Sequence, residues 1–167
     1  MSVHLYLHQH FVLYTILIFL PYITYGSTVW DTAPEQDLQK LQRMQNRAGK
    51  LLLRAHYRTP SAEVLTRLGW KNIKSIHRQQ KALLTYKALN NLLPVYMRNL
   101  FTYCRERSTR STRQSESNLL YLPMVHREAY RRCITYSGTV LWNSLRENVR
   151  QAPSLSSFKN LTRLEIM

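Results

Sequence analysis

Apolar residues recur along most of the chain at every third or fourth position, which predicts a mostly α-helical fold. The longest such stripe follows Pro34, and Thr32 and Glu35 stand there in the positions of a capping box. The stripe comprises Leu38, Leu41, Met44 or Gln45, Ala48, Leu51 and Leu52. Gly49 lies inside this helix, where glycine costs about 1 kcal/mol relative to alanine, and it indicates either close packing or drift.

Shorter helices are expected wherever an apolar stripe lies between a helix start and a helix stop. Pro60 begins a helix that ends at Gly69, and Ser154 is suited to cap the last helix. The other expected helices run over residues 73–93, from Pro94 to Phe101, and over residues 138–149. The side chains expected to anchor the packing are Trp30, Trp70 and Trp142.

Three stretches lack the helical pattern. Residues 102–118 contain four arginines and no aliphatic side chain, which is typical of a loop or a disordered basic arm. Residues 119–125 and 133–138 are expected to form two short strands or extended segments. The predicted fold class is therefore mostly α: a small irregular helical domain with an apolar N-terminal helix, a basic loop near 102–118 and up to two short strands.

The N-terminal segment contains one long apolar run from Phe11 to Ile23. It has three competing interpretations: a segment of the core, a signal or membrane anchor, and a full membrane span. A span needs about 20 apolar residues, whereas this run is shorter and contains Pro21. A signal peptide begins with basic residues, but no Lys or Arg precedes Lys40. The core segment is the favoured interpretation.

The chain has 167 residues, enough for one ordinary domain. Its 44% hydrophobic and 20% charged residues are typical of a globular protein. Composition divides it into an apolar segment 1–30, a helical basic region 31–101, the Arg/Ser/Thr-rich loop 102–118, and a C-terminal region 119–167 of extended segments and helices. Cys104 and Cys133 lack the close spacing of a zinc site, and we expect two buried free thiols.

The charge narrows the functional class. The formal net charge is +15, and Arg outnumbers Lys by 17 to 7. Since such an excess repels itself unless a polyanion relieves it, RNA or DNA is the expected partner and an anionic membrane surface the second. Two candidate binding sets are a helix face with Arg43, Arg47, Lys50 and Arg54, and a flexible arm with Arg105, Arg107, Arg110 and Arg113.

Residues for catalysis form no motif. A two-metal polymerase or nuclease needs converging carboxylates, but the only aspartates are Asp31 and Asp37, at a helix start where the helix dipole accounts for them. The four glycines are scattered and make no phosphate-binding loop. The chain is therefore expected to have no catalytic residues, to bind no metal and to need no cofactor.

Short motifs follow one another in a fixed order along residues 12–165. They include Tyr25-Gly26-Ser27-Thr28-Val29-Trp30, Leu38-Gln39-Lys40-Leu41-Gln42-Arg43-Met44-Gln45-Asn46-Arg47-Ala48, Leu68-Gly69-Trp70, Leu93-Pro94-Val95-Tyr96, Leu141-Trp142-Asn143-Ser144-Leu145 and Phe158-Lys159. This order resembles the extreme C-terminal region, after the palm and thumb, of reverse transcriptases encoded by animal non-LTR retrotransposons.

The resemblance implies a fragment of an RNA-directed DNA polymerase that lacks the palm and its metal-binding aspartates. Such a fragment would hold the backbone of RNA or DNA without sequence specificity. Gly49 and Arg146 depart from the residues usual in the family, as in a sequence that drifts without selection. A nuclear or cytoplasmic location is favoured. The alternative is a small secreted or membrane-anchored basic protein with residues 1–26 as its targeting segment.

Overall fold

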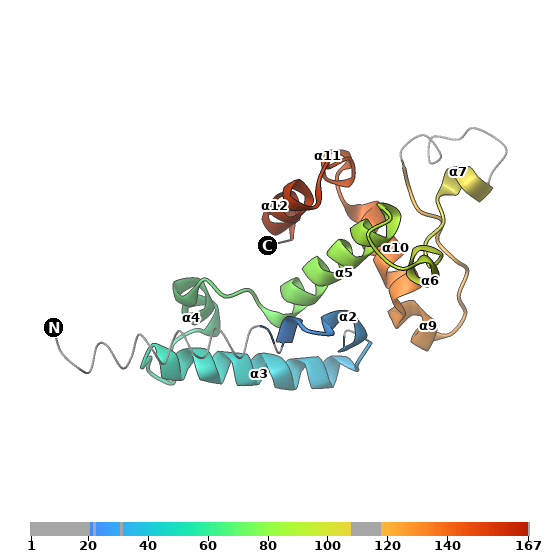
Figure 1. The fold of residues 1–167 in the computed structure, drawn as a ribbon. Helices are drawn as coiled ribbons and strands as arrows, with labels where there is room; N and C mark the ends of the chain where they lie inside the picture. Colours follow the sequence, from blue (N-terminus) through green and yellow to red (C-terminus); the bar gives the residue numbers. More distant parts are fainter. Residues whose placement is uncertain (1–20, 22, 31, 108–117, 167) are drawn as a thin grey trace. The chain divides into compact units, whose positions relative to one another are not determined.

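A computed structural model describes residues 21, 23–30, 32–107 and 118–166 (Figure 1). This part of the chain is mostly helical, as predicted. Its strand-like pairing is limited to one antiparallel bridge between Tyr103 and Leu120. The chain forms two compact units, Met1–His77 and Arg78–Met167. The division falls inside helix α5 (Ile73–Leu89) and therefore inside the predicted segment 31–101.

The first unit contains the long helix α3 (Glu35–Leu52), the shorter helices α2 (Ser27–Trp30) and α4 (Ser61–Leu68), and the start of α5. Helix α3 begins where the sequence predicts, but the predicted capping box is wrong. The residue before the helix is Pro34, which provides no side-chain cap. The hydroxyl of Thr32 donates instead to the carbonyl of Val29 at 2.6 Å, because the short α2 turn lies directly before it.

The buried face of α3 differs in part from the predicted stripe. Gln45, Gly49 and Leu52 are buried, whereas Met44 and Leu51 are 60% and 72% exposed. Of the two alternatives in the stripe, Gln45 is therefore correct, and the burial expected for Leu51 is wrong. The buried positions are four and three residues apart, so they form one line along the helix.

Gly49 allows α3 and α4 to approach closely. A Cβ atom at this position would lie 2.9 Å from Cγ1 of Val64 and 3.2 Å from Cδ1 of Leu68. Of the two explanations offered for Gly49, close packing is therefore the one with a structural basis. Helix α4 follows Pro60 and ends at Gly69, as predicted, and the φ of 65° at Gly69 is the left-handed conformation that glycine adopts without strain.

The core of the first unit consists of two small apolar clusters. One contains Leu52, Leu65 and Trp70, and the other Ile23, Ile73 and Ile76, with Leu41 partly buried against it. Ile23 is thus the end of the predicted apolar helix that the structure places in a core, and residues 1–20 lie outside the described part. Among the described helices, none has the length and apolar character needed to cross a membrane.

The second unit has one larger core around aromatic rings. Phe158 is fully buried, stacks on Tyr86 with 4.3 Å between ring centroids, and lies 5.9 Å from the ring of Trp142. The Tyr86 hydroxyl donates to the carbonyl of Ala152 at 2.9 Å, which satisfies its polar group inside the core. The described helices of this unit, besides the end of α5, are α6 (Val95–Arg98), α7 (Cys104–Arg107), α9 (Glu128–Arg132), α10 (Ile134–Ser144), α11 (Glu147–Arg150) and α12 (Leu155–Glu165).

Several predictions of local structure fail in this unit. The helix expected over residues 138–149 is interrupted at Leu145 and Arg146, between α10 and α11. Helix α5 ends at Leu89 instead of Leu93, because Asn91 adopts a left-handed φ of 59°. Most of the stretch 133–138, predicted as a short strand or an extended segment, lies in α10. This helix packs closely at Gly138, where a Cβ would lie 3.0 Å from Thr85 Oγ1, and tertiary packing of this kind overrides the strand preference of a short segment.

Other expectations for the second unit fare differently. Residues 119–125 form neither a helix nor a strand, and Leu120 makes the single bridge to Tyr103. The Ser154 hydroxyl accepts from the backbone N–H of Ser157 at 3.2 Å, so the predicted cap is confirmed. The prediction that both thiols are buried is wrong. Cys133 is exposed because it precedes α10 at the surface, and Cys104 is half-buried.

Candidate nucleic-acid interface

Three of the four cations predicted on the α3 face lie around one open hollow of about 440 Å³. The side chains that line this basic hollow are Arg43, Met44, Asn46, Arg47, Lys50 and Ser61. The cations share a face because they are three or four residues apart on one helix. Arg54 does not line the hollow; it follows the helix with a left-handed φ of 48°.

The described carboxylates of the first unit bind cations outside the basic hollow. The ion pairs are Lys74 with Glu35 at 2.9 Å, Lys40 with Asp37 at 2.8 Å, and Arg67 with Glu63. Within the described residues, Arg43, Arg47 and Lys50 therefore have no carboxylate partner. Because their charge is not neutralised locally, the hollow attracts anions.

A tyrosine that sequence reasoning missed lies beside this hollow. Nζ of Lys50 donates to the backbone carbonyl of Tyr57 at 2.7 Å, and Tyr57 itself is 68% exposed. The guanidinium of Arg58 lies 5.3 Å from its ring centroid and donates to its hydroxyl at 2.8 Å. Proteins stack unpaired bases on exposed rings flanked by cations. The sequence signal is weak, because it consists of one aromatic residue next to an arginine in the short segment between α3 and α4.

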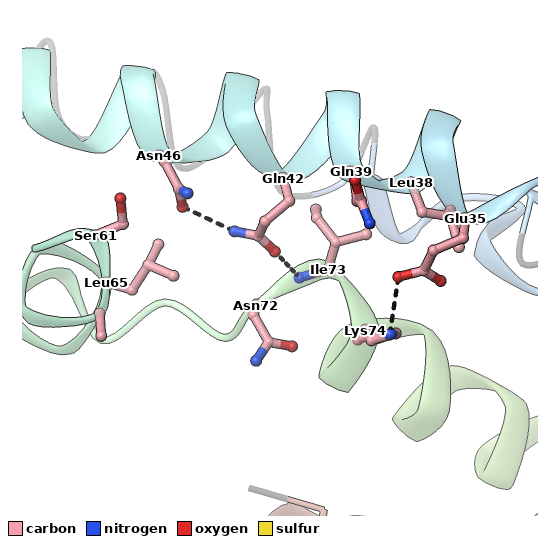
Figure 2. A pocket seen from close by; sticks show the side chains of 11 residues that line it. Glu35, Leu38, Gln39, Gln42, Asn46, Ser61, Leu65, Asn72, Ile73 and Lys74 are labelled. Carbon is pink, nitrogen blue, oxygen red and sulfur yellow. Dashed lines mark hydrogen bonds and ion pairs between the residues drawn. The ribbon is translucent and has the colours of Figure 1, made fainter.

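A second hollow, of about 340 Å³, lies on α3 between the starts of α4 and α5 (Figure 2). We call it the amide hollow, because its polar side chains include the amides of Gln39, Gln42, Asn46 and Asn72. Apolar side chains lie among them, and the ion pair of Glu35 with Lys74 lies at one end (Figure 2). The hollow therefore offers uncharged hydrogen-bonding groups beside an apolar surface.

Hydrogen bonds to the backbone determine how these amides are oriented. The N–H of Ile73 donates to Oε1 of Gln42 at 2.8 Å, so Nε2 of Gln42 faces the other way (Figure 2). That nitrogen donates to Oδ1 of Asn46 at 2.8 Å and to Oε1 of Gln45 at 2.9 Å. Gln45 in turn donates to the carbonyl of Lys71 at 2.8 Å. A backbone N–H can only donate, so Ile73 fixes Oε1 of Gln42 as the acceptor and leaves its Nε2 as the donor. Asn46 must then accept through Oδ1, and its Nδ2 points away from Gln42.

The second predicted set belongs to the second unit. Arg105 and Arg107 lie in α7, and their guanidinium carbons are 4.6 Å and 4.0 Å from the ring centroids of Tyr103 and Tyr121. A guanidinium that stacks on a ring keeps its N–H edge for a phosphate. The other two members, Arg110 and Arg113, lie outside the described residues.

Tyr103 lies near the start of the basic loop and is partly buried. Burial, which disfavours the phenolate, raises the pKa of Tyr103 above its ordinary value. The nearby charge of Arg105 acts in the opposite direction, and that of Glu106 adds to the rise. The base of the loop is therefore less exposed to water than its arginine content suggests.

The three tryptophans occupy different environments. Trp70 and Trp142 are 7% and 2% exposed and lie in the cores of their units, whereas Trp30 is 45% exposed and does not. Across the described ranges, no group of three or more His, Cys, Asp and Glu side chains is placed to hold a metal ion. Comparisons with models of protein families, with curated proteins and with solved structures gave no match.

Proposed function

We propose that this chain binds the phosphate backbone of RNA or DNA without sequence specificity and carries out no catalysis by itself. The observation that supports the proposal is the basic hollow, in which Arg43, Arg47 and Lys50 gather without a described carboxylate partner. Arginine matches phosphate in a bidentate manner. Phosphate contacts position a protein on nucleic acid but carry no sequence information.

We further propose that the chain is a remnant of a non-LTR retrotransposon reverse transcriptase, as the order of its motifs suggests. The apolar segment 1–30 would then be the end of a thumb-side helix, and the catalytic aspartates would belong to a palm outside this chain. The ion pair of Asp37 with Lys40 is consistent with a role for this aspartate at the start of a helix.

The salt dependence of binding tests the proposed interface. If about six phosphates are neutralised, the logarithm of affinity falls with the logarithm of salt concentration at a slope of roughly −4 to −5. The triple variant Arg43→Gln, Arg47→Gln and Lys50→Gln removes three contacts, and the slope should become shallower by about 2 to 3. Glutamine keeps the helix propensity of the replaced residues.

A matched control separates local contacts from net charge. The triple variant Lys40→Gln, Arg67→Gln and Lys159→Gln removes the same charge from exposed positions that do not line the basic hollow. Its slope should change by less than about 1, since it removes no proposed phosphate contact. Equal changes in the two triple variants would refute the interface, as would wild-type binding that does not depend on salt.

A further inference from the structure

The basic hollow and the amide hollow adjoin on α3. Both are lined by Asn46 and by Ser61. One offers cations, and the other offers amides beside the apolar side chains of Leu38, Leu65 and Ile73. A ligand that spans them would have an anionic part and, next to it, an uncharged polar part with an apolar face.

The hydrogen bonds around Gln42 make the shared residue a preorganised donor. Oδ1 of Asn46 is occupied by Gln42, and Nδ2 makes no hydrogen bond to another described residue. The Ser61 hydroxyl and the Gln39 amide likewise have no hydrogen-bond partner among the described residues. Of the two residues that line both hollows, Asn46 therefore presents free donor hydrogens and Ser61 presents a hydroxyl that donates or accepts. A complementary ligand carries acceptors such as ring nitrogens and carbonyl oxygens.

We propose that the amide hollow receives an unpaired base of single-stranded nucleic acid, whose flanking phosphate lies on Arg43, Arg47 and Lys50. The proposal rests on the proposed function and adds the form of nucleic acid that the site prefers. A base has acceptors on its edge and an apolar face, and its phosphate lies a short distance away. In a duplex the base is stacked and paired, so only a single strand presents it in this way. The volume of about 340 Å³ lies within the range of small-ligand pockets.

The test is to fill the amide hollow without changing a polar group. Ala62 lines the hollow and is exposed, so Ala62→Trp fits α4 while its ring blocks the space. The control is Ala129→Trp, the same change at an exposed helix position in the second unit. Full-length protein is titrated with labelled mixed-sequence single-stranded RNA, single-stranded DNA and a duplex of the same length.

Wild type should bind the single strands more tightly than the duplex, despite the higher charge density of the duplex. Ala62→Trp should weaken single-strand binding about tenfold, since a base contact is worth about 1–3 kcal/mol. Its duplex affinity should stay within about twofold of wild type, and Ala129→Trp should change neither. A loss with RNA, DNA or both supports the proposal and identifies the strand that the site takes.

A second variant tests the donor without adding bulk. Asn46→Leu removes the free Nδ2 group, together with the Oδ1 that accepts from Gln42, and single-strand affinity should fall about fivefold, as expected for one hydrogen bond to the ligand. Its control is Asn160→Leu, on the exposed surface of α12. The proposal is overturned if Ala62→Trp and Asn46→Leu leave single-strand binding unchanged, or weaken duplex binding equally. If the triple variant of Arg43, Arg47 and Lys50 still weakens binding in that case, only the base-binding proposal is refuted and the proposed function stands. If wild type binds no nucleic acid at all, the proposed function is refuted as well.

Discussion

The side-chain amide of Asn143 makes both hydrogen bonds of a strand partner with the backbone of Leu120. Its Oδ1 accepts from the N–H of Leu120 at 2.9 Å, and its Nδ2 donates to the carbonyl of Leu120 at 2.9 Å. The adjacent indole of Trp142 donates to the carbonyl of Asn118 at 3.3 Å. These two neighbouring side chains on α10 thus hold the segment that returns from the basic loop.

Replacing this amide should destabilise the second unit. Leu120 is 1% exposed, so water has little access to the two groups that Asn143→Ala leaves without partners. Each such group costs about 1–3 kcal/mol, and we expect a loss of about 2–4 kcal/mol in the free energy of unfolding, measured with urea. Asn148→Ala, at an exposed position, should stay within about 0.5 kcal/mol of wild type. Equal losses in both variants would contradict the role of Asn143.

Gly49→Ala should test the close packing of α3 and α4. In an ordinary helix interior this substitution stabilises by about 1 kcal/mol. Here the new methyl group would lie 2.9 Å from Cγ1 of Val64, a stiff and fully buried side chain, and overpacking costs about 1–3 kcal/mol. We expect a net loss of up to about 2 kcal/mol in the free energy of unfolding.

A double-mutant cycle provides the control for Gly49. Val64→Ala removes the closer of the two atoms, and only the end of the Leu68 side chain remains near. Gly49→Ala introduced into this background should therefore become stabilising, by up to about 1 kcal/mol. A Gly49→Ala variant that stabilises the wild-type background by the same amount would show that the glycine is drift and not a packing requirement.

The sequence predicts the helices whose ends are marked locally. Pro60, Gly69 and Ser154 act on their own neighbours, and all three stand where the structure begins or ends a helix. Local signals fail where distant packing decides. Residues 133–138 have strand preference, but Gly138 meets Thr85, more than fifty positions earlier in the chain, and the segment is mostly helical.

The candidate site was predictable only in its charges. The spacing of Arg43, Arg47 and Lys50 places them on one helix face, since a helix repeats every 3.6 residues. The amide hollow was not predictable. Gln42 and Gln45 owe their orientation to backbone groups of Ile73 and Lys71, which are 31 and 26 positions away from them. The helical periodicity of the sequence cannot predict contacts with residues so far along the chain.

The raised pKa of Tyr103 predicts a loss of stability in alkali. Since the folded state holds this proton more tightly than the unfolded chain does, the stabilisation is fully present below about pH 10 and is lost as the pH rises through the raised pKa. Tyr103→Phe should therefore lose less stability than wild type between pH 9 and pH 11, measured by urea unfolding. Tyr96→Phe, at a residue 73% exposed, should follow wild type. Parallel curves for wild type and Tyr103→Phe would contradict the prediction.

The last prediction concerns the arginines of the basic loop. If all four contact phosphate, replacing Arg105, Arg107, Arg110 and Arg113 by Ala should make the salt slope of binding shallower by about 2 to 4, without changing the ranking of different sequences. Arg105 and Arg107 have their planes held over tyrosine rings, which lowers the entropy lost on binding.

The control removes the same charge from exposed positions of the second unit, at Arg127, Arg131, Arg132 and Arg146. Its slope should change by less than about 1, because counterion release depends on contacts and not on total charge. Circular dichroism should show the same helical signal for both quadruple variants and wild type. If the loop variant keeps its helices and its salt slope equals that of wild type, the loop is a solvated linker. The basic hollow on α3 then remains as the surface that binds phosphate, and its triple variant should account for most of the salt dependence.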